Sequence, residues 1–203
     1  MKLFYSATSP FVRKCLVAAH ELGLSDRIEL LPVNVSPVKR DRTVVASNPL
    51  GQVPTLITDD GAAIYDSRVI FEYLNALAGG ALMSDEGEER WKALTEQALA
   101  DGMLDAAILA RYETAVRPEN LRWKEWTAGQ IDKITCGLDE LEKRAADFGD
   151  RVDLGTISFA CALAYLDLRY QHLEWRQSRP NAAAWFEWFG GRESMVTTRP
   201  PAA

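Results

Sequence analysis

The chain changes character once along its length, and this change limits the folds that it can adopt. Up to about residue 77, short β-type runs alternate with helical patterns, whereas the rest shows apolar residues only at helical spacing. With 203 residues, the chain is long enough for one large domain or two small ones. The pattern therefore predicts an α/β domain over residues 1–77, a glycine-rich linker over 78–84 and an all-helical domain over 85–203.

The first part begins with a strand, a helix and a second strand. Lys2–Ser6 and Ile28–Val35 are β-type runs, and Phe11–Leu22 between them carries a helical apolar stripe that Gly23 closes. A β-α-β unit favours parallel pairing of its two strands. A polar connection with one short helix follows, and then two strands at 55–58 and 62–65, joined by a hairpin turn, and a helix that opens at Asp66-Ser67. The predicted order is β-α-β-α-β-β-α.

The second part is expected to be helical throughout. Four segments have apolar residues at helical spacing: Arg90–Val116, Trp123–Phe148, Thr156–Tyr170 and Asn181–Phe189. Their tryptophans are interpreted as core residues: Trp123, Trp126, Trp175, Trp185 and Trp188. The end of the chain, Met195–Ala203, reads as a loose tail.

Charge and cysteine content exclude several classes of function. The chain has 23 basic and 29 acidic residues, a formal net charge of −6, and so lacks the basic footprint of a dedicated nucleic-acid-binding protein. Three widely spaced cysteines without a CxxC motif argue against a disulfide framework or a zinc site and favour a reducing, cytoplasmic location. The most apolar run, Ile157–Leu166, is half the length of a membrane span.

The first segment with chemical potential lies between the first strand and the first helix. Helix N-termini expose unpaired N–H groups and the positive end of the helix dipole, so they stabilise an anion without a basic side chain. A hydroxyl at Thr8 or Ser9 would add a donor at the same place. A thiolate held there would have a lowered pKa, and the thiolate is the nucleophilic form of sulfur. The structural alternative is that Ser9 only caps the helix.

Two further segments have the same double interpretation. Val53-Pro54 precedes a strand, and a cis bond there would turn the Val53 backbone N–H and C=O outward to pair with a peptide-like ligand. Asp66-Ser67 opens a helix, where its hydroxyl and carboxylate either cap the helix or hold a ligand's carboxylate and ammonium groups.

The order of these segments along the chain resembles the glutathione transferase superfamily, and most of all its bacterial serine- or cysteine-type members. The matching words are SPFVRK at 9–14, NPLGQVPTL at 48–56 and YDSRVIFEYL at 65–74. The resemblance covers nearly the whole chain, because a helical second domain of this size also belongs to the family. It implies a thioredoxin-like first domain.

The resemblance also implies that glutathione is the ligand. Asp66 and Ser67 would hold its γ-glutamyl group, and the Val53 backbone, before a cis Pro54, would pair with its cysteinyl part. Lys39 is a weak candidate for the glycyl carboxylate. The glutathione thiolate would lie near Ser9.

Ser9 is the preferred activator of that thiol. It occupies the place of the cysteine in members that read Cys-Pro-Phe, and Thr8 is the alternative; Tyr5, at the strand end, is the weakest candidate. Val12 stands where a glutaredoxin-like site has its second cysteine. With no sulfur at either position, disulfide exchange by the protein itself is disfavoured at this site.

The implied reaction is attack of the thiolate on an electrophilic small molecule, in a role such as detoxification. The family layout suggests a second-substrate pocket lined by Phe11, Met103, Ala106, Leu109 and Tyr112. It also implies a homodimer and no metal or tightly bound cofactor. Two alternatives remain: a glutathione-dependent peroxidase or disulfide reductase, and a non-catalytic protein that only binds at the glutathione site.

One departure from the family concerns the capping of a late helix. In Gly155-Thr156-Ile157-Ser158, Thr156 replaces the family's usual capping-box acid, and Asp153 takes an N-cap-like place. This leaves the capping of that helix open, but not the fold.

Overall fold

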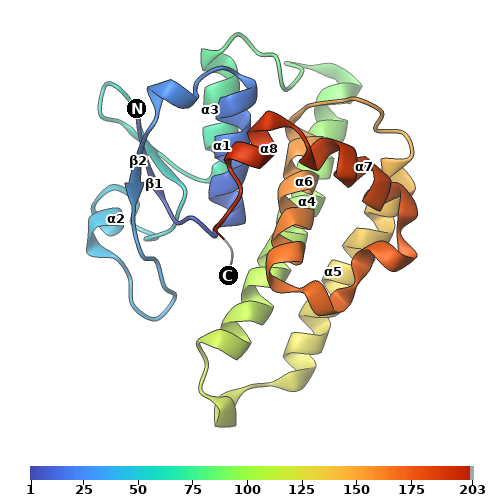
Figure 1. Ribbon diagram of the computed structural model, residues 1–203. Coiled ribbons are helices and arrows are strands. Elements are labelled where there is room, and N and C mark those ends of the chain that lie inside the picture. The colour runs from blue at the N-terminus through green and yellow to red at the C-terminus, as the bar shows by residue number, and fades with distance from the viewer. Residues whose placement is uncertain (202–203) are drawn as a thin grey trace. The chain divides into compact units, whose positions relative to one another are not determined.

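The computed structural model describes residues 1–201, and the chain forms two compact units (Figure 1). The first unit comprises Met1–Trp91 together with the segment from Arg192 onward, and the second comprises Lys92–Gly191. The connection after residue 77 packs within the first unit, where Leu82 and Met83 are buried and the Asn75 side chain accepts a hydrogen bond from Leu82 N at 2.8 Å. The linker at 78–84 stays a prediction.

The first unit is built on a four-stranded mixed sheet. Its strands are β1 (Lys2–Tyr5), β2 (Glu29–Pro32), β3 (Thr55–Ile57) and β4 (Ala63–Ile64), in the order β2-β1-β3-β4. The pairing of β1 with β2 is parallel, as the β-α-β pattern predicts, and β3 pairs antiparallel with both β1 and β4. The predicted fold class is confirmed.

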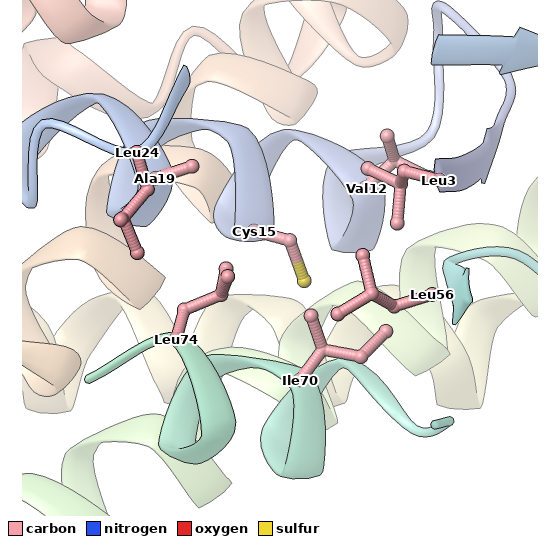
Figure 2. Close-up of a cluster of buried hydrophobic side chains, with 8 residues drawn as sticks. All are labelled: Leu3, Val12, Cys15, Ala19, Leu24, Leu56, Ile70 and Leu74. Carbon is pink, nitrogen blue, oxygen red and sulfur yellow. The ribbon is translucent and has the colours of Figure 1, made fainter. Parts of the chain in front are cut away.

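The helices of this unit follow the predicted order. They are α1 (Pro10–Glu21), the single 3₁₀ turn η1 (Ser25–Arg27), α2 (Arg42–Ser47) and α3 (Ser67–Leu77). Side chains from α1, α3 and the sheet meet in one apolar cluster (Figure 2), formed by Leu3, Val12, Cys15, Ala19, Leu24, Leu56, Ile70 and Leu74. The periodicity of apolar residues thus predicts both the strands and helices of this unit and the side chains that pack between them. This packing fixes where the ends of the strands and helices lie.

The C-terminal segment is not the loose tail that its composition suggests. It forms α8 (Glu193–Thr197), with Met195 buried, whereas residues 202–203 lie outside the described part. The Arg192 guanidinium pairs with the Glu21 carboxylate at 2.8 Å, and this hydrogen bond holds the Glu21 pKa below its usual value. Arg13 Nη2 donates to Met195 O at 2.8 Å. These polar contacts with α1 order the segment.

The second unit is helical. Its elements are α4 (Gly87–Ala115, which begins in the first unit), η2 (Glu119–Leu121), α5 (Lys124–Ala145), α6 (Leu154–Arg169), η3 (Gln171–Leu173), η4 (Trp175–Ser178) and α7 (Pro180–Gly190). Trp175 and Trp185 are buried as predicted, but the core interpretation is wrong for Trp123 and Trp188, which are exposed.

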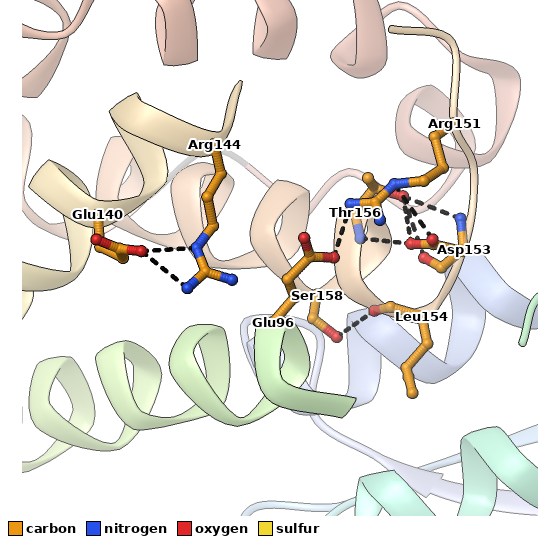
Figure 3. Close-up of polar contacts among 8 residues, drawn as sticks. All are labelled: Glu96, Glu140, Arg144, Arg151, Asp153, Leu154, Thr156 and Ser158. Carbon is orange, nitrogen blue, oxygen red and sulfur yellow. Dashed lines mark hydrogen bonds and ion pairs between the residues drawn. The ribbon is translucent and has the colours of Figure 1, made fainter. Parts of the chain in front are cut away.

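Helix α6 begins with a capping box whose two residue types are exchanged relative to the family pattern. The Asp153 carboxylate accepts from Thr156 N at 2.9 Å, and the Thr156 hydroxyl accepts from Asp153 N at 2.9 Å (Figure 3). Both orphan donors are satisfied, because acid and hydroxyl have changed places with their hydrogen-bonding roles preserved. The capping that the sequence left open is therefore present.

The exchanged box predicts a measurable stability effect. Replacing Asp153 by alanine removes the acceptor for Thr156 N, and we expect a loss of about 1–2 kcal/mol in the free energy of unfolding, measured in urea. Asp150→Ala, an exposed acid in the same loop, is the matched control and should change stability by less than about 0.5 kcal/mol. Equal effects of the two substitutions would contradict a specific capping role.

Candidate functional site

The register of the sheet brings four separate connections to one end of the first unit. In the ladders, Tyr5 pairs with Pro32, Phe4 pairs with Thr55 and Leu56 pairs with Ile64. Consequently β1 and β2 end, β3 begins and β4 ends at the same edge. The segments that continue from these ends are 6–9, 33–41, 48–54 and 65–67, and they contain every residue predicted to bind the ligand in this unit.

Ser9 is the N-cap of α1. Its φ and ψ of −77° and 120° are extended, and its hydroxyl oxygen accepts a hydrogen bond from Val12 N at 3.3 Å. The capping role is therefore real, but it uses only acceptor capacity, so the hydroxyl proton remains available to donate to an anion. Pro10, which has no N–H, occupies the first helical position. Thr8 and Ser9 are both half-buried.

A polar network holds the loop that carries Val53. The buried Asn48 side chain donates to Thr55 Oγ1 at 3.0 Å and to Gln52 O at 3.2 Å, and Thr55 Oγ1 also donates to Gln52 O at 2.8 Å. The Val53-Pro54 bond is cis. Within residues 1–201, the Val53 N–H and C=O have no hydrogen-bond partner, so both are free to pair with an extended ligand.

Asp66 and Ser67 form the start of α3. Asp66 is the N-cap and accepts from Arg68 N at 3.0 Å, while the Ser67 hydroxyl donates to the Asp66 carboxylate at 3.1 Å. The Tyr65-Asp66 bond is also cis. Cys15 Sγ contacts Ser67 O at 3.7 Å, which joins α1 to the first turn of α3. Asp66 remains exposed and Ser67 is 3% exposed, so the carboxylate is the accessible member of the pair.

The charged segment before α2, Lys39–Asp41, makes two structural contacts that the sequence analysis does not predict. Lys39, the weak candidate for the glycyl carboxylate, is exposed. Arg40, however, donates to Pro49 O and ties this segment to the Val53 loop, and the Asp41 carboxylate accepts from Thr43 N at 2.8 Å as the N-cap of α2. The acid before a short helix was the available signal for the cap, whereas nothing local indicated the long-range contact of Arg40.

The residues predicted to line a second-substrate pocket are divided between the two units. Phe11 is half-buried on α1. On α4, Met103 and Ala106 are buried, Leu109 is exposed and Tyr112 is half-buried. A Cβ on Gly137 of α5 would lie 2.4 Å from Met103 Cγ, so Met103 packs closely on that helix. Their role as pocket walls stays a prediction.

Three other features concern metal ligands, cysteines and membrane-spanning helices. In the part of the chain that the structure describes, no group of three or more His, Cys, Asp or Glu side chains is placed to hold a metal ion. Cys15, Cys136 and Cys161 form no disulfide with one another, and Cys15 and Cys161 are buried. None of the helices within residues 1–201 combines the length and apolarity that crossing a bilayer requires.

Comparison with known proteins agrees with this geometry. Residues 8–77 match the glutathione S-transferase N-terminal domain, and residues 124–187 match the glutathione S-transferase C-terminal domain. The chain is 36% identical over 207 residues to the uncharacterized GST-like protein YibF of Escherichia coli K12, with both chains fully covered. It is similar to a glutathione transferase family member from Pseudomonas fluorescens Pf-5 solved with bound glutathione, at 45% identity, a TM-score of 0.96 and 98% coverage of each chain.

A second crystal structure from the same organism contains S-(propanoic acid)-glutathione and matches at 44% identity and a TM-score of 0.91, covering 99% of this chain and 100% of the other. The sequence words, the strand order, the two-unit organisation and these similarities all agree. The chain belongs to the glutathione S-transferase family.

Proposed function

We propose that the protein is a glutathione transferase that binds glutathione at the common strand-end edge of its first unit and activates the thiol with Ser9. The observation that carries the proposal is the geometry of Ser9, whose hydroxyl caps α1 as an acceptor and keeps its proton free to donate. A thiolate at this place would gain a hydrogen bond and the favourable end of the helix dipole.

The neighbouring residues suit the rest of glutathione. The unpaired Val53 N–H and C=O would bond the cysteinyl backbone, and the exposed Asp66 carboxylate would accept from the γ-glutamyl ammonium. Ser67 and the N–H groups of the first turn of α3 would donate to the γ-glutamyl carboxylate. Lys39 is the candidate for the glycyl carboxylate. The glutathione bound in the related crystal structure supports this assignment of the ligand.

The proposed reaction is a nucleophilic attack. The thiol proton passes to solvent, the thiolate sulfur forms a bond to an electrophilic carbon, and that carbon either releases its leaving group or passes the electron pair to a conjugated acceptor, which takes up a proton. No covalent enzyme intermediate is required, and catalysis rests on activation and positioning of the nucleophile. S-(propanoic acid)-glutathione in the related structure is a product of the same type, a glutathione S-conjugate.

One feature favours conjugation over reduction. Ser9 and Val12 occupy the positions that carry cysteines in dithiol sites, so a reductase mechanism would need a second glutathione to supply the other sulfur. A non-catalytic binding role would keep the Val53, Asp66 and Ser67 contacts without requiring Ser9.

We further propose that the protein acts in the cytoplasm as a homodimer and takes part in detoxification.

The stoichiometry of turnover distinguishes the three functions. With a chlorinated aromatic electrophile, we expect one glutathione consumed for each conjugate formed and no oxidised glutathione, measured by mass spectrometry. With cumene hydroperoxide, consumption of two glutathiones and release of oxidised glutathione at a comparable kcat/KM would contradict the transferase assignment. Binding of glutathione without turnover of either substrate would favour the binding-protein alternative.

A further inference from the structure

The connection between α6 and α7 forms a cavity of about 400 Å³. Its walls come from one stretch of the second unit: the last turn of α6 and the two 3₁₀ turns η3 and η4. The lining residues are Asp167, Gln171, Glu174, Trp175, Arg176 and Gln177. Sites for small molecules in proteins begin at about 300 Å³, so this cavity is large enough for a compact ligand.

One carboxylate of the cavity is already neutralised within the protein. Both terminal nitrogens of the Arg176 guanidinium bond the two Asp167 carboxylate oxygens, with Nη2 at 2.6 Å from Oδ2, and Trp175 Nε1 donates to Asp167 Oδ1 at 2.9 Å. The same guanidinium stacks over the Trp175 ring, 4.3 Å from its centroid. This bidentate pair cancels the charge of Asp167 and fixes one wall of the cavity.

Glu174 supplies the remaining charge of the cavity. Within residues 1–201, the side chains of Glu174, Gln171 and Gln177 make no hydrogen bond or ion pair, and all three are exposed. The backbone holds these residues in place, because Glu174 N donates to Gln171 O at 3.1 Å and Gln177 N donates to Glu174 O at 3.0 Å. Glu174 itself is in the left-handed region, with φ 42° and ψ 38°. Strained backbone of this kind in a residue other than glycine is concentrated at ligand sites.

The open acceptors match one class of ligand. A primary ammonium group has one positive charge and three N–H donors. The cavity presents three side chains with acceptor oxygens to spare: the Glu174 carboxylate and the amide carbonyls of Gln171 and Gln177. Its two carboxylates and one guanidinium sum to a charge of −1, which favours a cation over an anion.

We propose that this cavity binds a small organic molecule through a primary ammonium group, with Glu174 as its ion-pair partner and Gln171 and Gln177 as further acceptors. The site goes beyond the proposed glutathione chemistry. Glutathione also has an ammonium group, but its two carboxylates make it an anion at neutral pH, and the net negative cavity repels it. The ligand class is therefore an alkylamine or diamine without a carboxylate.

Butane-1,4-diamine and the uncharged butane-1,4-diol are matched probes for the site. Titration of the ¹⁵N-labelled protein with each would be followed by NMR, through the backbone N–H signals of Gln171, Glu174 and Gln177 and the indole N–H signal of Trp175. Because hydrogen bonds to charged groups contribute about 1.5–3 kcal/mol, the diamine should bind about 10- to 100-fold more tightly than the diol.

Charge-matched variants show whether Glu174 is the partner. Glu174→Gln should reduce the preference for the diamine to about threefold or less, and Gln171→Leu and Gln177→Leu should each reduce it in part. Glu125→Gln on α5 removes the same charge from an exposed acid outside the cavity and should retain the preference. Unchanged signals elsewhere in the spectrum of each variant confirm that folded proteins are compared.

Three results would overturn the proposal. The first is a diamine titration that leaves the signals of the cavity unmoved, and the second is equal binding of diamine and diol. The third is an equal loss of the preference in Glu174→Gln and Glu125→Gln, which would show diffuse attraction to an acidic protein instead of a site. Stronger binding of butyrate than of the diamine would likewise assign the cavity to anions. The proposed transferase function involves none of these residues and is tested separately.

Discussion

Replacing Arg151 by glutamine is expected to destabilise the second unit by about 3 kcal/mol. Arg151 Nη2 lies 2.6 Å from Glu96 Oε2, and the side chains are 21% and 1% exposed (Figure 3). Arg151 Nε also lies 3.3 Å from the Asp153 carboxylate that caps α6. The substitution therefore leaves a buried carboxylate on α4 without its cation. Urea unfolding of both proteins measures the effect.

The loss of unfolding free energy in Arg151→Gln should depend on pH. Burial raises the Glu96 pKa above its usual 4.5, although Arg151 opposes the shift. Because the folded state holds this proton more tightly than the unfolded state, stability from this group falls as pH rises from about 4.5 through the raised pKa. Loss of Arg151 raises the pKa further. Arg151→Gln should therefore lose less unfolding free energy, relative to the unaltered protein, at pH 5 than at pH 8.

Two controls separate the buried charge from a general loss of a surface arginine. Arg144→Gln removes an ion pair whose partners, Glu140 and Arg144, are 37% and 32% exposed, and should cost less than about 1 kcal/mol. Adding Glu96→Gln to Arg151→Gln removes the charge and should restore part of the loss. A deficit for Arg151→Gln that matches Arg144→Gln and does not vary with pH would contradict the account.

Replacing Ser9 by alanine is expected to lower kcat/KM for conjugation about 10- to 100-fold. The variant removes a hydrogen bond to the thiolate, and hydrogen bonds to charged groups contribute about 1.5–3 kcal/mol. Since about 1.4 kcal/mol corresponds to a factor of ten in rate, the loss follows directly. Below the pKa of the bound thiol, where the sulfur is protonated in both proteins, the Kd of glutathione should change little, because Val53, Asp66 and Ser67 remain. Steady-state kinetics with a chlorinated aromatic electrophile gives the rate, and calorimetry gives the affinity.

The Ser9 variant also loses its cap on α1, so a conservative substitution is needed beside it. Ser9→Thr keeps both the hydroxyl and the ability to cap, and should retain most of the activity. Thr8→Val removes the alternative hydroxyl and should leave kcat/KM within about threefold. If Thr8→Val abolishes turnover and Ser9→Ala does not, Thr8 and not Ser9 is the activator.

Local patterns predicted the elements of this protein well, because each element carries its own signal. The periodicity change near residue 77, the β-α-β start and the acid at Asp153 all express short-range rules of pairing and capping. The family words at 9–14, 48–56 and 65–74 then identified segments that the sheet register brings to one edge. That register depends on pairing between strands, so the sequence alone indicated the participants and not their spacing.

What the sequence did not predict depends on contacts between distant residues. Helix α8 was missed because its order comes from Arg192 binding Glu21, 171 positions earlier. Glu96 and Arg151 are 55 positions apart and individually look like solvated charges.

The central claim, that the N-terminus of α1 and the Ser9 hydroxyl activate a bound glutathione thiol, is tested most directly by titrating that thiol. Thiolate absorbance would be followed against pH with saturating glutathione, for the unaltered protein, Ser9→Ala and Thr8→Val. We predict a thiol pKa well below the usual cysteine value of about 8.5 in the unaltered protein and in Thr8→Val, and a return toward that value in Ser9→Ala. Bound glutathione with an unshifted thiol pKa in the unaltered protein would contradict the claim.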